Sequence, residues 1–145
     1  MRYSIRRAGP ADAPSVKALL AAHRLPSDGI RPHLDTFLVA HAANGDLLGS
    51  AGLELYPDSA LLRSVAVQEP HHGAGIGGQL TEAALHLARH RGILEVYLLT
   101  ETAADFFPRH GFAPVGRSTV PASIRQTEAF TTLCSTQAVV MHCAL

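Results

Sequence analysis

This sequence has few cysteines and no net charge, and both features exclude several classes of protein. Only Cys134 and Cys143 occur, without a CxxC pair, so we expect neither a disulfide framework nor a zinc knuckle. The 12 basic residues match the 12 acidic residues, whereas proteins that bind nucleic acid or anionic membranes concentrate positive charge. The sequence therefore predicts no nucleic-acid partner.

Long apolar runs and internal breaks are also missing. No stretch approaches the ~20 apolar residues that span a bilayer, and no signal-peptide core follows residues 1–7. Hydrophobic residues fill 47% of the 145 positions, a globular composition, and no repeat or linker divides the chain. We expect a single cytoplasmic domain over residues 1–145, with no membrane partner, as a monomer or homodimer.

Hydrophobic periodicity predicts alternating strands and helices. Strands are expected at 3–7, 36–42, 46–56, 60–67, 93–100, from 112, and at 138–145. Helices are expected at 12–24, from the glycines at 73–78 to about 91, at 102–110 and at 121–133. Asn44-Gly45 favours a tight hairpin turn, and Gly49 and Gly52 suggest a bulge.

One pair of strands is expected to be parallel. The strand 93–100 is apolar on both faces, as strands of parallel sheets are, and a helix separates it from the strand 60–67. The order predicts a mixed α/β (α+β) domain, with antiparallel strands first and one parallel β-α-β crossover in the middle.

A glycine-rich loop carries the strongest chemical signal. Gly73, Gly75, Gly77 and Gly78 stand between a strand and a helix. There, free main-chain N–H groups and the positive helix end favour an anion such as phosphate. The glycines could instead serve only a tight turn.

Two other nucleotide-binding motifs fit this loop less well. Gly73, Gly75 and Gly78 satisfy G-x-G-x-x-G, with Glu101 downstream, but a dinucleotide fold needs several parallel β-α-β units and only one is available. A P-loop needs a lysine after the glycines, and the only lysine is Lys17.

The stretch HHGAGIGGQL resembles the pyrophosphate loop of the GNAT family of N-acetyltransferases. Gly75 and Gly77 match the two small positions of the family's pattern, and His72 stands where the family usually has Arg or Gln. His72 keeps a hydrogen-bond donor there and makes the phosphate contact depend on pH. TAADFFPRHGF resembles the family's closing helix and Gly-Phe signature, and the similarity covers nearly the whole chain.

The resemblance implies a GNAT-like acyl-CoA N-acyltransferase fold. Strands ending at Val67 and Thr100 would splay apart and admit acetyl-CoA, with pantetheine on the main chain of Val65 and Val67 and pyrophosphate on the loop amides. The residues expected at the cofactor are Val65, Ala66, Val67, His72, Gly73, Ala74, Gly75, Ile76, Gly77, Gly78, Thr102, Ala104 and Phe107.

Acetyl transfer needs an uncharged amine, a donor for the oxyanion and a proton for the departing thiolate. Most family members place a Tyr for the last task where this sequence has Phe107. A thiol pKa of about 8.5 makes the thiolate a tolerable leaving group, so solvent or the Thr100 hydroxyl could suffice; Thr100 could also simply end its strand. Glu54 interrupts an apolar strand and is the candidate base, unless it lies on a solvated outer face.

The stretch from Val96 to Ile124 resembles amino-acid N-acetyltransferases, including the glutamate type and small arsenic-resistance members, in which the position of Phe107 is also commonly not Tyr. The resemblance implies an acceptor with an amino and a carboxylate group, covered by the helix 121–133, with Cys134 nearby. Arg63 and Arg125 are the expected carboxylate-binding residues, although Arg63 could equally extend into solvent.

Other catalytic patterns find little support. His86 and His90 share a helix face but lack a third ligand placed by spacing, so we expect no metal site. No G-x-S-x-G elbow is present, which argues against a hydrolase. The sequence predicts an acetyl-CoA-dependent N-acetyltransferase that acts on a small amine by direct attack on the thioester. The alternatives are a non-catalytic acyl-CoA-binding module, which Phe107 favours, and an enzyme acting on a protein amine.

Overall fold

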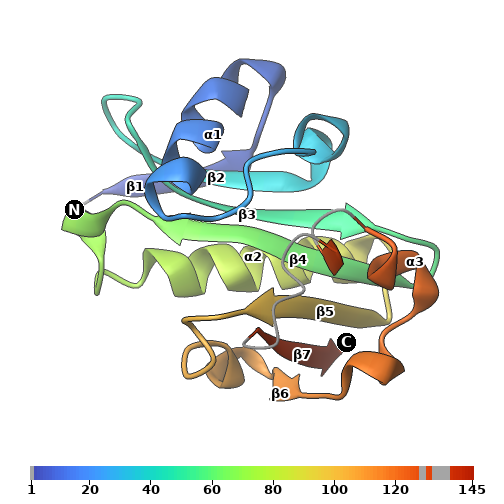
Figure 1. Ribbon diagram of the computed structural model, residues 1–145. Coiled ribbons are helices and arrows are strands. Elements are labelled where there is room, and N and C mark those ends of the chain that lie inside the picture. The colour runs from blue at the N-terminus through green and yellow to red at the C-terminus, as the bar shows by residue number, and fades with distance from the viewer. Residues whose placement is uncertain (1, 128–129, 132–137) are drawn as a thin grey trace.

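A computed structural model of the chain describes residues 2–127, 130–131 and 138–145 (Figure 1). The strands are β1 (Tyr3–Arg7), β2 (Phe37–Ala42), β3 (Leu47–Leu55), β4 (Ser59–Val67), β5 (Glu95–Thr100), β6 (Ala113–Pro114) and β7 (Val139–Ala144). The α-helices are α1 (Ala13–Ala22), α2 (Ile76–His90) and α3 (Ala122–Arg125). Short 3-10 helices are η1 (Pro10–Asp12), η2 (Arg31–Thr36), η3 (Glu69–His71), η4 (Phe107–His110) and η5 (Arg117–Thr119).

The described strands form one seven-stranded sheet in the order β1-β2-β3-β4-β5-β7-β6. Neighbours are antiparallel except β4 and β5, which are parallel and joined through α2. The prediction of a mostly antiparallel sheet with one β-α-β crossover is confirmed. The pairing register of β2 with β3 shifts between Ala40 and His41, where Leu48 is the extra residue, so the bulge expected in the strand 46–56 is present beside Gly49.

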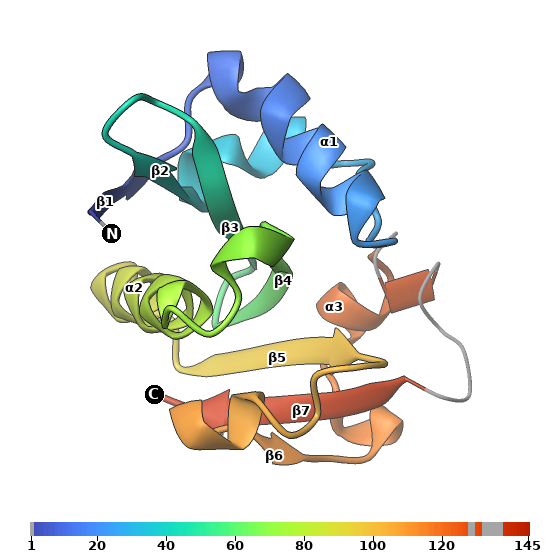
Figure 2. The same cartoon turned by 90° about the vertical axis from the view of Figure 1, so that its left-hand side faces the viewer.

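Helices cover both faces of the sheet (Figure 2). One stripe of α2 packs on one face, because residues three and four positions apart lie on the same side of a helix; its buried members are Ile76, Leu80, Ala84, Leu85 and Ala88. The opposite face carries two separate apolar clusters. One gathers under α1 and the other under α3.

Two helices differ from the sequence prediction. The segment 102–110 forms only the short η4, which ends at Gly111 with a φ of 89°. The expected helix 121–133 stops as α3 at Arg125. Thr127 then accepts a hydrogen bond from the N–H of Phe130 at 3.1 Å, as an N-cap does, and residues 130–131 are again helical. Residues 128–129 and 132–133 lie outside the described part of the chain.

Candidate active site

The parallel strands β4 and β5 stay paired only over their first residues. Ser59, Ala60 and Leu61 face Glu95 to Tyr97, and these two fully described strands pair no further. β4 continues beside β3 to Val67, whereas β5 continues beside β7 to Thr100. The strands therefore separate toward their carboxyl ends, as the sequence resemblance implies (Figure 1).

A bulge in β4 lies just beyond this separation. Arg63 pairs with Gly52 and Ala66 with Ser50, so β4 has one residue more than β3 between the two pairs. Ser64 takes a left-handed conformation with a φ of 60°, which costs a non-glycine residue energy. Two contacts hold it: the Ser50 hydroxyl donates to the Ser64 carbonyl at 2.7 Å, and Arg63 Nε donates to Ser64 Oγ at 3.0 Å.

The glycine loop presents uncapped main-chain amides beside this opening. Gly73 and Gly75 have φ values of 86° and 82°, which side chains other than glycine rarely adopt. Gly75 immediately precedes α2, and no described side chain caps this helix end. The first amides of α2 therefore lack a partner within the helix and lie at its positive end. These residues fit the pyrophosphate group that the sequence predicts here.

The other two glycines of the loop allow close packing. A Cβ at Gly77 would lie 3.5 Å from Val67 Cγ2 and 3.6 Å from the Phe106 ring. A Cβ at Gly78 would lie 3.5 Å from the His110 ring. These distances are ordinary van der Waals contacts for a methyl group, so α2 lies close against β4, Phe106 and η4.

His72 contacts the strand edge that the cofactor is expected to use. The N–H of Gln68 donates to the Leu48 carbonyl, so the adjacent pair of Gly49 and Val67 is not hydrogen-bonded and the Val67 main chain points away from β3. The Val67 carbonyl accepts a hydrogen bond from His72 Nε2 at 2.7 Å. The Val67 carbonyl, which the sequence resemblance assigns to pantetheine, is therefore hydrogen-bonded to His72 in this structure. The contact with pantetheine stays a prediction.

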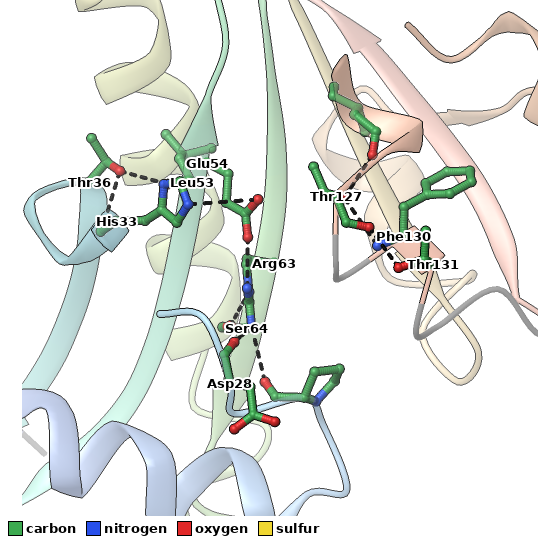
Figure 3. A network of polar contacts seen from close by, with 12 residues as sticks. Asp28, His33, Thr36, Leu53, Glu54, Arg63, Ser64, Thr127, Phe130 and Thr131 are labelled. Carbon is green, nitrogen blue, oxygen red and sulfur yellow. Dashed lines mark hydrogen bonds and ion pairs between the residues drawn. The ribbon is translucent and has the colours of Figure 1, made fainter. Parts of the chain in front are cut away.

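Glu54 lies in a buried polar network on the face shared by α1 and α3 (Figure 3). It is only 4% exposed, so the alternative of a solvated outer position is wrong. Tyr56 donates to Glu54 Oε1 at 2.7 Å, Arg63 Nη1 donates to Oε2 at 2.7 Å, and His33 Nε2 lies 3.9 Å from Oε1. Its hydrogen-bonding partners are therefore polar side chains of the same chain.

The Arg63 side chain is buried and makes four hydrogen bonds within its own chain. Its side chain is 8% exposed, so the alternative that it extends into solvent is wrong. Besides Glu54 and Ser64, it donates from Nη2 to the carbonyls of Pro26 at 3.2 Å and Asp28 at 3.0 Å. Of its five N–H donors, one on Nη1 has no partner among the residues that the structure describes. Arg63 does hold a carboxylate, that of Glu54, and its role as a clamp for a substrate stays a prediction.

The sequence reasoning missed Tyr56 and His33. Tyr56 could have been found, because it follows Glu54 by two positions and side chains two apart in a strand share a face. Burial, together with the hydrogen bond to Glu54, raises the pKa of Tyr56 far above its usual value, so this hydroxyl stays protonated and keeps donating to Glu54. His33 lies in η2, far from Glu54 in the sequence, and only folding brings the two side chains together.

The residues expected at the thioester are spread around the end of β5. The Thr100 hydroxyl oxygen accepts a hydrogen bond from the Ala103 N–H at 2.9 Å, so it shapes the turn after the strand. Thr102 is exposed and Ala104 half-buried in that turn. Phe107 is 6% exposed in the core against α2. The catalytic role of Thr100 and the cofactor contacts of the other three stay predictions.

Several candidate residues lie apart from the Glu54 network. Arg125 is exposed on α3, and Cys134 is outside the described residues. His86 and His90 are exposed with ring centroids 5.0 Å apart. The described residues contain no group of three His, Cys, Asp or Glu side chains that could hold a metal ion. No helix within the described ranges is long and apolar enough to cross a membrane.

Comparison with known proteins identifies the family. Residues 33–114 match the acetyltransferase (GNAT) domain family. An amino-acid acetyltransferase of Mycobacterium tuberculosis is 31% identical over 133 residues, which are 85% of this chain and 75% of that protein. An uncharacterised N-acetyltransferase of Chlorobaculum tepidum is 32% identical over 98 residues, 67% of this chain and 62% of that protein.

Solved structures show the same fold. A Mycobacterium tuberculosis protein crystallised with CoA and NLQ has a TM-score of 0.84 and 25% identity, covering 98% of this chain and 99% of that one. N-acetylglutamate synthase of Neisseria gonorrhoeae, complexed with coenzyme A and N-acetyl-glutamate, has a TM-score of 0.85 at 21% identity, over all of this chain and 35% of that one. The chain therefore belongs to the GNAT family and is an N-acetyltransferase whose cosubstrate is acetyl-CoA.

Proposed function

We propose that the amine acceptor is a small amino-acid-like molecule, whose uncharged amine attacks the thioester directly. The observation that carries this proposal is the similarity to an amino-acid acetyltransferase over 85% of the chain. The charge balance supports it, because polycationic acceptors favour an acidic groove and the 12 acidic residues are matched by 12 basic ones.

Glu54 is the proposed proton acceptor for the ammonium form of the substrate. Among the described residues each carboxylate oxygen accepts one hydrogen bond, from Tyr56 or from Arg63, which leaves it a lone pair for a water molecule or the ammonium group. Acetyl-CoA supplies the activated acetyl group. The Thr100 hydroxyl, whose oxygen accepts from Ala103, still has its own hydrogen to donate toward the departing thiolate, and solvent can serve the same purpose.

Arg125 is the proposed partner of the acceptor carboxylate. It is exposed on α3, and the neighbouring Ile124 belongs to the apolar cluster against which Tyr56 of the Glu54 network packs. Arg63, the other expected partner, is committed to Glu54 and to main-chain carbonyls. A cytoplasmic location, a link to arsenic resistance and a monomeric or dimeric state stay predictions of the sequence.

The test is to mix the protein with acetyl-CoA and a panel of amines. A colorimetric assay measures the free thiol released, and mass spectrometry detects the acetylated product. The panel contains L-glutamate, L-glutamine, a short peptide with a free N-terminus, and 4-aminobutanoate, which is glutamate without its α-carboxylate. We expect an amino acid to react about 10–100-fold faster than its decarboxylated analogue, because a charge-assisted hydrogen bond contributes about 1.5–3 kcal/mol. Turnover of the peptide alone, or thiol release that does not depend on the amine, would contradict the proposal.

A further inference from the structure

The turn at residues 26–29, between α1 and η2, has little to hold its main chain in place. Residues 28–29 form a local turn, and within the described part of the chain no main-chain hydrogen bond joins the four residues to a strand or to η2. The carbonyls of Pro26 and Asp28 instead both accept from Arg63 Nη2, at 3.2 and 3.0 Å. One guanidinium group therefore supplies the hydrogen bonds that fix the 26–29 turn.

The same guanidinium connects the 26–29 turn to the candidate base and to the bulge. Nη1 donates to Glu54 Oε2 at 2.7 Å and Nε donates to Ser64 Oγ at 3.0 Å. The Arg63 and Glu54 side chains are 8% and 5% exposed. Water thus competes little for these bonds, and their geometry is well defined.

The 26–29 turn lies on the same face of the sheet as Glu54, the proposed proton acceptor (Figure 3). In Figure 3 the turn and Arg63 stand on one side and Thr127 with Phe130 on the other, on the face of the sheet that α1 and α3 share. A shift of the turn would therefore move the main chain that Arg63 joins to Glu54, the proposed proton acceptor for the substrate.

We propose that Arg63 is a positioning residue for the acceptor. It fastens the 26–29 turn to β4 and at the same time holds Glu54, so that the wall of the acceptor site and the candidate base keep a fixed relation to the bulge. The catalytic part of this inference rests on the proposed function, whereas the fastening of the turn does not.

Limited proteolysis tests the fastening without any acceptor. Endoproteinase Asp-N cuts before aspartate, and the Ser27–Asp28 bond lies inside the 26–29 turn. Arg63→Lys keeps the positive charge, but a single ammonium group cannot reach Glu54, Ser64 and two carbonyls together. We expect cleavage at this bond to be about tenfold faster or more, because it follows the population of locally opened chain. Arg91→Lys, at an exposed arginine after α2, is the matched control and should cleave at the parent rate.

A second variant keeps the proposal testable if Arg63→Lys does not fold. The double variant Glu54→Gln/Arg63→Gln leaves no unpaired buried charge and still removes the bonds to the turn. It should also cleave faster at Ser27–Asp28. Cleavage at the parent rate in a folded variant would overturn the proposal.

Kinetics of Arg63→Lys separate positioning from a purely structural role. With L-glutamate, or the amino acid that the panel selects, we expect KM for the amine to rise about tenfold or more while KM for acetyl-CoA stays within about twofold. Faster cleavage with an unchanged amine KM would leave only a structural role and reject positioning. A raised amine KM with unchanged cleavage would instead identify Arg63 as the substrate clamp. Because proteolysis needs no acceptor, failure of the proposed function would leave its result intact.

Discussion

At the scale of single residues, Glu54 is the side chain whose surroundings bear most directly on catalysis. If it takes the ammonium proton, Glu54→Gln should lower the rate by roughly 10²–10⁴ near neutral pH and leave acetyl-CoA affinity nearly unchanged. The variant also leaves Arg63 without its anionic partner, so a loss of stability is expected, and the rate must be measured well below the melting temperature.

Tyr56→Phe is the matched control for this change. It removes one donor to Glu54 but keeps the carboxylate and its bond to Arg63, so its rate should fall much less. Full activity of Glu54→Gln would reject the base assignment. In that case the acceptor amine would lose its proton to solvent before binding.

Asp12 provides a second residue-scale prediction, on stability. Two hydrogen bonds from Arg6 and one from the Gly9 N–H lower the pKa of Asp12 to about 2, although partial burial opposes this. A lowered pKa stabilises the fold above the unfolded value near 3.9, and the contribution is lost as pH falls toward about 2. Arg6 is half exposed, so we expect Asp12→Asn to cost only about 1 kcal/mol.

Denaturant unfolding of the parent and of Asp12→Asn over a pH series checks this prediction. The difference in unfolding free energy should be full at about pH 5 and should shrink toward about pH 2. A difference that stays constant over this range would show that the ion pair contributes nothing through its charge.

At the scale of elements, Gly75 and Gly77 of the glycine loop have different reasons for being glycine. Gly75 has a φ of 82° with open space where a Cβ would lie, whereas a Cβ at Gly77 would meet ordinary contacts at 3.5 Å and beyond. Gly75→Ala should distort the entry to α2 at a cost of about 1–2 kcal/mol and weaken acetyl-CoA binding. Gly77→Ala should bind acetyl-CoA nearly as the parent does.

Calorimetric titration of both folded variants with acetyl-CoA makes this comparison. Equal affinities of the two variants and the parent would mean that the loop's conformation does not matter for the cofactor.

At the scale of the whole molecule, the sequence predicted most local elements but not the contacts between distant segments. Period-2 and period-3.6 patterns are local, so they placed the strands and α2 within a few residues. The helix 121–133 was wrong because α3 ends at Arg125; the Thr127 hydroxyl accepts from the Phe130 N–H, and such local side-chain bonds compete with the helix. Glu54 and Arg63 stood out as charges in apolar strands, but their pairing with each other and with Pro26 and Asp28 depends on contacts between distant segments.

The most direct test of the whole account asks where acetyl-CoA binds. Amide hydrogen exchange can be followed with and without saturating acetyl-CoA, with NADH as the comparison ligand. The account predicts that acetyl-CoA slows exchange at the loop and first turn of α2, residues 73–79, and along β4 at residues 65–67, while NADH changes neither. The amides of Ile76, Gly77 and Gly78 are best suited to report binding, because the first N–H groups of a helix lack partners within it. Protection elsewhere with these segments unchanged, or protection by NADH instead, would contradict it.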